Sequence, residues 1–278
     1  MRVVFVADLF SHQLNGGAEN NDSVLVDYLS NSGLSVEKVH SYYVNEEIIN
    51  ENDLFIIGNF INLKEQYKQA LLNKNYIIYE HDHKYLKSRD PSVFPEFVAP
   101  ENQIINKEFY KSAKAVVVLS SICKRIIEES LNINNVYNIG CSLWSDERLD
   151  YIASLLKQKK NRKFAILDSK NSIKNTGLAI RYCTDNNIDF DLIKPCGEKE
   201  LLLELSKYEG LVFLPGVLET FSRISAEAKM LNCKLITKPK MLGFASEEAF
   251  NLTGVDLIKE IRKRKNKALL LFKHLLEK

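Results

Sequence analysis

Two glutamates in the C-terminal half of the chain have a spacing that suits the binding of hydroxyl groups. Glu219 follows the apolar run Leu211–Leu214 after a short turn, and Glu227 lies about two turns along the helix expected to open near Thr220. Carboxylates placed in this way accept hydrogen bonds from the vicinal hydroxyls of a sugar or a ribose. The alternative is that Glu219 is simply an acid at a helix N-terminus and Glu227 an exposed helix residue.

The same helix start is suited to binding an anion. A helix that opens near Thr220 leaves the backbone N–H groups of Thr220, Phe221 and Ser222 without helical partners. These groups and the positive end of the helix dipole favour a phosphate.

Basic residues follow an earlier apolar run. Lys170 and Lys174 lie after the expected strand Phe164–Leu167, and Arg223 or Arg89 would add a guanidinium. A lysine neutralises phosphate as a point charge, without the bidentate fork of arginine. The alternative is a solvated loop that carries lysines.

The N-terminal half has a glycine pair at the start of a helix, in Asn15-Gly16-Gly17-Ala18-Glu19. Glycines allow the backbone to approach a phosphate or a sugar closely, and the helix N-terminus favours the anion. An ordinary turn between a strand and a helix is the alternative.

Two histidines, His81 and His83, follow the fourth expected strand. They lack a third anchored ligand, so we expect no metal site and keep a structural histidine pair as the alternative. Asp189 and Asp191 flank Phe190 at a strand start and are expected to be solvated. The sequence contains no Ser/His/Asp arrangement, P-loop or EF-hand pattern, and we expect no cofactor.

Short apolar runs alternate with amphipathic segments along the whole chain. Continuous apolar runs are typical of strands that are buried on both faces, as in a parallel sheet covered by helices. The expected strands are Val3–Ala7, Val36–His40, Leu54–Gly58, Tyr76–Tyr79, Ala115–Leu119, Val136–Ile139, Phe164–Leu167, Phe190–Ile193, Leu211–Leu214 and Lys234–Thr237. The expected helices are Ala18–Leu29, Leu63–Leu72, Ile122–Leu131, Lys174–Cys183, Glu198–Lys207, Phe221–Leu231 and Asp256–Leu276.

The pattern predicts an α/β protein of two Rossmann-like domains, each a doubly wound parallel sheet, with residues 1–143 in the first and 144–278 in the second. The carboxyl ends of the strands of both domains would point into an interdomain cleft that holds the ligand. The last helix, at about 256–277, is expected to pack back toward the N-terminal domain. An alternative is that its basic face rests on an anionic membrane surface.

Composition limits the class of protein. The 278 residues are 45% apolar and 27% charged, with a net charge of +2. From Leu257 to the end there is an excess of six positive charges, so the rest of the chain sums to −4, which argues against nucleic-acid binding. Five scattered cysteines exclude a disulfide framework and suit a cytoplasmic protein. We expect neither a signal peptide nor a membrane span.

The segments Pro215-Gly216, Glu219-Thr220-Phe221-Ser222 and Glu227-Ala228-Lys229-Met230-Leu231-Asn232, followed by a strand from Lys234, resemble a family signature. They are similar to the C-terminal signature of retaining GT-B glycosyltransferases of the GT4 type, including its two glutamates with seven residues between them. The family loop reads Glu-Gly-Phe-Gly. This chain replaces both glycines, with Thr220 and Ser222, which bears on the identity and tightness of binding of the donor sugar.

The resemblance implies roles for the residues of the second domain. Glu219 would hold hydroxyls of the transferred sugar and Glu227 the ribose. The substrate-binding loop Thr220–Arg223 would present the N–H groups of Phe221 and Ser222 to the diphosphate. Lys174 best matches the family's Lys-Gly lysine, and Lys170 stands where the family has an arginine.

In the first domain, the resemblance places Gly16 and Gly17 beside the donor phosphates and the acceptor. A family His-Asp element matches His81 best, with His83 as the second choice, and this histidine would reach the donor sugar.

The implied activity is metal-independent transfer of a sugar, with retention, from a nucleotide-diphosphate sugar to a hydroxyl of a glycan, lipid or small molecule. An inactive GT-B homologue that binds a nucleotide sugar or acts as a scaffold is the alternative, and a nucleotide-sugar epimerase is a second. We expect a cytoplasmic protein, with peripheral membrane contact through the basic last helix left open, and no nucleic-acid partner.

Overall fold

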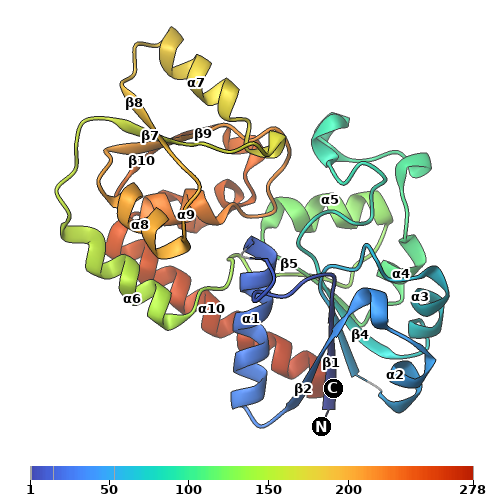
Figure 1. Ribbon diagram of the computed structural model, residues 1–278. Coiled ribbons are helices and arrows are strands. Elements are labelled where there is room, and N and C mark those ends of the chain that lie inside the picture. The colour runs from blue at the N-terminus through green and yellow to red at the C-terminus, as the bar shows by residue number, and fades with distance from the viewer. Residues whose placement is uncertain (1, 15, 53, 278) are drawn as a thin grey trace. The chain divides into compact units, whose positions relative to one another are not determined.

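The computed structural model describes residues 2–14, 16–52 and 54–277, so Asn15 of the glycine turn lies outside the described residues. The chain divides into two compact units (Figure 1). Unit 1 comprises Met1–Trp144 and Arg264–Lys278, and unit 2 comprises Ser145–Lys263. Each unit contains one parallel sheet, which confirms the prediction of an α/β chain with two parallel sheets.

The sheet of unit 1 has the strand order β2-β1-β3-β4-β5-β6. Its strands are β1 (Arg2–Ala7), β2 (Ser35–His40), β3 (Leu54–Ile57), β4 (Asn75–Tyr79), β5 (Ala115–Val118) and β6 (Val136–Asn138). All pairs are parallel, with Val3 opposite Val36 and Val6 opposite Ile57. The chain runs outward from β1 to β2 and then crosses back past β1 to β3. The topological switch point, where the strand order reverses, therefore lies between β1 and β3.

Helices connect these strands. They are α1 (Gly17–Asn31), α2 (Glu46–Glu51), α3 (Glu65–Leu71), α4 (Lys107–Lys111) and α5 (Ser121–Leu131). The sequence predicts α1, α3 and α5 but not the short α2 and α4. In α1 the buried apolar residues Leu25, Val26 and Leu29 recur at helical spacing and face the sheet.

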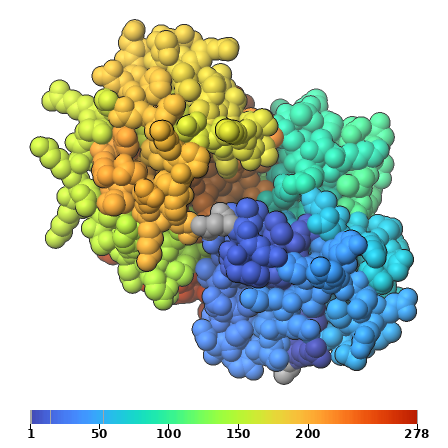
Figure 2. All heavy atoms as spheres, in the orientation of Figure 1, coloured from blue at the N-terminus to red at the C-terminus, as the bar shows by residue number. Residues whose placement is uncertain are grey.

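A long segment of short 3₁₀ turns separates β4 from α4 in unit 1. The turns cover Pro91–Val93, Pro95–Phe97 and Glu101–Gln103. Its base is closed by backbone hydrogen bonds from Lys87 N to the Gln103 carbonyl oxygen (3.1 Å) and from Ile105 N to the Tyr85 carbonyl oxygen (2.8 Å). Figure 2 shows this segment, in teal, gathered into one lobe on the surface of unit 1.

The sheet of unit 2 has the strand order β10-β9-β7-β8. Its strands are β7 (Phe164–Leu167), β8 (Phe190–Ile193), β9 (Gly210–Phe213) and β10 (Lys234–Thr237), all within one residue of the predicted bounds. The helices are α6 (Asp146–Ser154), α7 (Thr176–Asp185), α8 (Glu198–Ser206) and α9 (Arg223–Met230). Ile166, Val212 and Leu214 pack on Ala179 and Cys183 of α7 in a buried core. The switch point lies between β7 and β9.

The last helix, α10 (Gly254–Glu277), contributes to both units. Leu257 and Ile261 are buried in its first half, and Phe272 is buried in its second half, where its ring lies 4.9 Å from that of Tyr79. Most of the apolar side of α10 is therefore covered by protein, and contact of its basic face with a membrane stays a prediction. Among the described residues, no helix combines the length and the apolar character needed to cross a membrane.

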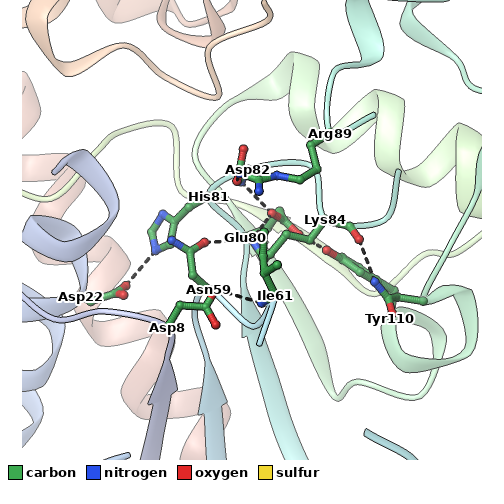
Figure 3. Close-up of polar contacts among 11 residues, drawn as sticks. Asp8, Asp22, Asn59, Ile61, Glu80, His81, Asp82, Lys84, Arg89 and Tyr110 are labelled. Carbon is green, nitrogen blue, oxygen red and sulfur yellow. Dashed lines mark hydrogen bonds and ion pairs between the residues drawn. The ribbon is translucent and has the colours of Figure 1, made fainter. Parts of the chain in front are cut away.

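A buried ion pair organises the loop that follows β4 (Figure 3). Lys84 Nζ lies 2.5 Å from Glu80 Oε1, the Tyr110 hydroxyl also donates to Glu80, and the Asp82 N–H donates to Glu80 Oε1 (2.7 Å). Burial raises the pKa of the Glu80 carboxyl. The charge of Lys84 and these hydrogen bonds outweigh burial and lower that pKa to about 2. The network fixes the backbone on both sides of His81.

The turn before α9 carries an unusual backbone conformation. Ser222 has φ 76° and ψ 82°, in the left-handed region that favours glycine, and its hydroxyl lies 2.9 Å from that of Ser225. A side chain in this region costs roughly 1–2 kcal/mol. The backbone therefore has the form that a glycine would supply, although the residue is serine.

We expect Ser222→Gly to be more stable than Ser222→Ala by about 1 kcal/mol, because both variants lose the hydroxyl but alanine keeps the Cβ at positive φ. Urea unfolding measures the difference. At Ser225, inside α9, the order should reverse, because glycine costs about 1 kcal/mol relative to alanine in a helix. An alanine variant at 222 as stable as the glycine variant would contradict the left-handed turn.

We expect Glu80→Gln to lower the free energy of unfolding at pH 7 by about 3–5 kcal/mol, because Lys84 loses its buried partner. The folded-state pKa of Glu80 is depressed, so its contribution is present above the unfolded value of 4.5 and is lost as the pH falls toward 2. The difference in the free energy of unfolding between wild type and variant, measured by urea unfolding, should therefore become smaller over that pH range. The exposed pair Arg125–Glu129 (2.9 Å) provides the control, and Glu129→Gln should cost less than about 1 kcal/mol. A gap for Glu80→Gln that does not change with pH would contradict this account.

Candidate functional site

Lys174 and Glu219 meet at the switch point of unit 2. Lys174 ends a 3₁₀ turn after β7, and Glu219 lies between β9 and α9. Lys174 Nζ is 2.9 Å from Glu219 Oε1, and the side chains are 32% and 17% exposed. The ammonium group also lies 5.4 Å from the ring centre of Phe213 at the end of β9. A partly exposed cation and an acceptor carboxylate thus lie together at the carboxyl ends of two neighbouring strands.

Backbone contacts hold the two loops of this pair against each other. Gly216 N donates to the Ile173 carbonyl oxygen (2.9 Å), and a Cβ at Gly216 would come within 3.4 Å of the Ser172 carbonyl oxygen. Glu219 forms an isolated bridge with Leu242, and its carbonyl oxygen accepts from Gly243 N (2.8 Å). The backbone of both residues is therefore fixed before any ligand arrives.

The helix after Glu219 begins later than the sequence predicts. Its first residue is Arg223 and not Thr220, so the predicted start of the helix is wrong. The N–H groups of Phe221 and Ser222 precede the helix. The reason is that Phe221 is anchored in the core, with its ring 5.1 Å from Phe244 and its carbonyl oxygen accepting from Phe244 N (2.9 Å). Ser222 then turns the backbone into the left-handed region.

The backbone N–H groups at the start of α9 belong to residues after Ser222, and not to Phe221 and Ser222. The first helical hydrogen bond runs from Ala226 N to the Ser222 carbonyl oxygen (3.3 Å), so the helix gives no partner to the N–H groups of Ile224 and Ser225. Arg223, half-buried, is the first residue of this turn, and Lys170 is exposed in the loop after β7. Among the described residues, no hydrogen bond or ion pair joins Lys170 to Lys174 or Glu219.

Glu227 is buried and bound by an arginine. Arg148 of α6 donates to Glu227 Oε1 from Nε (2.9 Å) and Nη2 (2.8 Å), and Nη1 donates to Glu198 of α8. Burial lowers the pKa of Arg148, but the two carboxylates raise it above its usual value. The sequence analysis missed Arg148, because 79 residues separate it from Glu227 and its helix carries no motif.

The glycine turn of unit 1 accommodates a carboxylate. Gly16 caps α1, Gly17 is its first residue, and a Cβ at Gly16 would lie 2.2 Å from Glu19 Oε2. The Glu19 side chain therefore folds back toward Gly16 at the start of the helix. Burial raises the pKa of its carboxyl. A side chain at position 16 would require the Glu19 carboxylate to move away.

His81 forms a buried pair with an acid of α1 (Figure 3). Its Nε2 lies 2.8 Å from Asp22 Oδ1, both side chains are 2% exposed, and the Tyr79 ring stands 4.2 Å away. His83 is buried with φ 51°. Within the described part of the chain, no three His, Cys, Asp or Glu side chains are grouped to hold a metal ion. The sequence analysis missed Asp22, which lies 59 residues from His81.

The structure thus sorts the predicted site residues into separate groups. In unit 2 it brings Lys174 to Glu219 and leaves Glu227 with Arg148. In unit 1 it joins His81 to Asp22.

No family model matches the chain, and no curated protein matches it by sequence. Solved structures do match. HepE from Anabaena in complex with UDP-glucose is 13% identical, with 99% of this chain and 92% of that chain covered and a TM-score of 0.51. A glycosyltransferase from Rickettsia africae is 13% identical, with 99% and 98% covered and a TM-score of 0.50.

An alpha-glucosyltransferase in complex with UDP and DNA gives 12% identity, 97% and 92% coverage and a TM-score of 0.49. The expected absence of a nucleic-acid partner stays a prediction. At such identities the likeness to HepE and to the Rickettsia protein concerns the fold, which over nearly the whole chain is similar to that of glycosyltransferases of the GT-B type.

Proposed function

We propose that this chain is a retaining glycosyltransferase that moves a sugar from a nucleotide-diphosphate sugar to a hydroxyl acceptor without a metal ion. The observation that carries the proposal is the Lys174–Glu219 pair, 2.9 Å apart at the switch point of unit 2. The similarity in fold to HepE, whose solved structure contains UDP-glucose, supports a nucleotide-sugar donor.

In this proposal Lys174 stabilises the negative charge that develops on the departing diphosphate, and Glu219 accepts hydrogen bonds from hydroxyls of the transferred sugar. The amide groups of Ile224 and Ser225 at the positive end of α9 add to the stabilisation. Groups fixed in place before the reaction are most effective where charge develops. The backbone contacts of Gly216 and Glu219 supply that fixation.

The proposed reaction needs no covalent enzyme intermediate. The bond from the anomeric carbon to the diphosphate oxygen breaks, and a bond to the acceptor oxygen forms on the same face. The proton of the acceptor hydroxyl passes to the leaving phosphate oxygen. The products are a glycoside and a nucleoside diphosphate, and Glu227, held by Arg148, would receive the ribose hydroxyls.

A second candidate function is nucleotide-sugar binding without transfer. It is favoured by Thr220 and Ser222, which replace glycines of the resembled loop, and by the engagement of Glu227 with Arg148. A donor that raises the Tm while no nucleoside diphosphate is released in the presence of acceptors would support this candidate over transfer.

We expect Lys174→Ala and Glu219→Gln each to reduce nucleoside diphosphate release by about 10²–10³-fold, because each removes a group that acts on the transition state. A thermal-shift screen of UDP-, GDP-, ADP- and dTDP-glucose selects the donor, and release is then measured with and without acceptors. Both variants should keep the circular dichroism spectrum and cooperative unfolding of the wild type.

Lys163→Ala is the matched control. Lys163 pairs with Asp191 (2.8 Å) in the same sheet, but it precedes β7 and so lies at the amino ends of the strands. This variant should release nucleotide at the wild-type rate. Turnover at the wild-type rate in Lys174→Ala and Glu219→Gln would show that these two residues do not have the proposed roles.

We expect Arg148→Ala to weaken nucleoside diphosphate binding more than tenfold and to lower the free energy of unfolding by about 3–5 kcal/mol, because it leaves Glu227 buried without its cation. Titration calorimetry with the selected nucleotide and urea unfolding measure the two effects. Arg181→Ala, at an exposed position of α7, should change neither. If a folded Arg148→Ala protein binds the nucleotide with unchanged affinity, Glu227 does not take part in nucleotide binding.

A further inference from the structure

A hollow in unit 1 opens along one face of α1. Its lining includes Glu19, Asp22, Ser23 and Asp27, which recur at helical spacing, together with Phe10 after β1 and Lys38 of β2. We call it the α1 hollow. Figure 2 shows the segment after β1 and the start of α1, in dark blue, on the surface of unit 1.

Three of the six polar residues that line the α1 hollow are acidic, and one, Lys38, is basic. Glu19 and Asp22 are buried in it, whereas Asp27 and Lys38 are exposed. Glu19 is 7% exposed as a whole residue. Carboxylates accept hydrogen bonds from hydroxyl groups and repel phosphates. The lining therefore suits a neutral ligand rich in hydroxyls.

A series of aromatic rings leads outward from the wall of this hollow. The ring centres of Phe10 and His40 lie 5.0 Å apart, those of His40 and Tyr43 6.0 Å, and those of Tyr43 and Tyr42 5.5 Å. We call these four residues the aromatic ladder. Tyr42 and Tyr43 are 61% and 66% exposed, which is unusual for large rings and leaves much of their surface accessible to a ligand.

The exposed tyrosines stand on a fixed loop. The Ser41 hydroxyl donates to the Asp8 carboxylate, which also accepts from the N–H groups of Ile61 (2.9 Å) and Asn62 (3.0 Å). Val44, on the other side of the tyrosines, is buried. The loops after β1, β2 and β3 are thereby tied together at the edge where ligands of α/β proteins bind.

Charge near the aromatic ladder argues against a polyanion. The helix that follows, α2, carries exposed glutamates at 46, 47 and 51 and no basic residue. Two ammonium groups lie over rings of the ladder, that of Lys64 over Tyr42 at 5.5 Å and that of Lys38 over Phe10 at 5.7 Å. A phosphate polymer or an anionic membrane would meet more negative than positive charge here, whereas a sugar ring can stack on tyrosine and hydrogen-bond to carboxylates.

We propose that the α1 hollow and the aromatic ladder together form a binding site for a neutral oligosaccharide, and that this saccharide is the acceptor. The second part rests on the proposed function, whereas the binding itself does not. The sugar rings stack on Tyr42 and Tyr43, and hydroxyl groups donate to Asp27 and Glu19 in the hollow.

Direct binding to the intact chain tests the site without turnover. Maltohexaose, cellohexaose and chitohexaose serve as probes in titration calorimetry, beside a 12-nucleotide single-stranded DNA and phosphatidylglycerol vesicles. We expect at least one saccharide to bind the wild type. The double variant Tyr42→Ala/Tyr43→Ala should weaken that binding at least tenfold, and Asp27→Asn should weaken it several-fold.

Two exposed positions away from the site provide controls. Tyr137→Ala, on β6, and Asp185→Asn, at the end of α7, should bind the saccharide as the wild type does. Any of three outcomes would overturn the proposal: no saccharide binding, saccharide binding unaffected by the Tyr42/Tyr43 change, or binding of DNA or vesicles that this change abolishes.

The failure of the site and the failure of the proposed function give different results. If nucleotide release requires Lys174 but no saccharide binds, the acceptor site is wrong and the transferase proposal stands. If a saccharide binds through the tyrosines but no donor is hydrolysed, the site stands and the transferase proposal fails.

Discussion

Burial of the sheets on both faces is the constraint from which the rest of the structure follows. Every residue of β5 and of β9 is buried, and an unpaired charge in such a strand would lose its hydration. Polar side chains that can bind ligands or take part in chemistry therefore lie where strands end. In unit 1 these are Asp8 after β1 and Glu80 after β4, and in unit 2 Glu219 follows β9. The strand order then decides which of these ends are neighbours.

Three of the buried carboxylates each have a cation or a ring nitrogen beside them. Glu80 has Lys84, Asp22 has His81, and Glu227 has Arg148. Removing charges from water is costly, and the cost is offset only when the partners are well placed and further hydrogen bonds complete the site. Such pairs therefore allow few alternative geometries. They fix the loop after β4 and the packing of α6 against α9.

The sequence predicts the strands well because each is a continuous apolar run, and burial of such runs leaves few choices. It misses α2 and α4, which are too short to show a helical period. It places the start of α9 too early, because the conformation of Ser222 depends on the packing of Phe221 against Phe244, which no local pattern encodes.

The polar partners are the part of the site that sequence reasoning could not reach. Lys174 and Glu219 are expected as site residues through a family resemblance, but their contact joins loops 45 residues apart. Arg148 and Asp22 have no motif, and their partners lie 79 and 59 residues away. A signal did exist for Asp22, since an acid three residues after Glu19 falls on the same helix face.

The two glutamates of the signature differ in how easily their present partners can be exchanged. The Lys174–Glu219 pair is partly exposed, and pairs of this kind contribute about 0–1 kcal/mol, so a diphosphate and a sugar hydroxyl can replace the mutual contact at little cost. Glu227 is 3% exposed at its side chain and is bound by Arg148, and separating such a pair costs several kcal/mol. A ligand that uses both glutamates would therefore exchange the partner of Glu219 and add to the existing contact of Glu227. This difference makes Glu219 the adaptable member of the pair and Glu227 the fixed one.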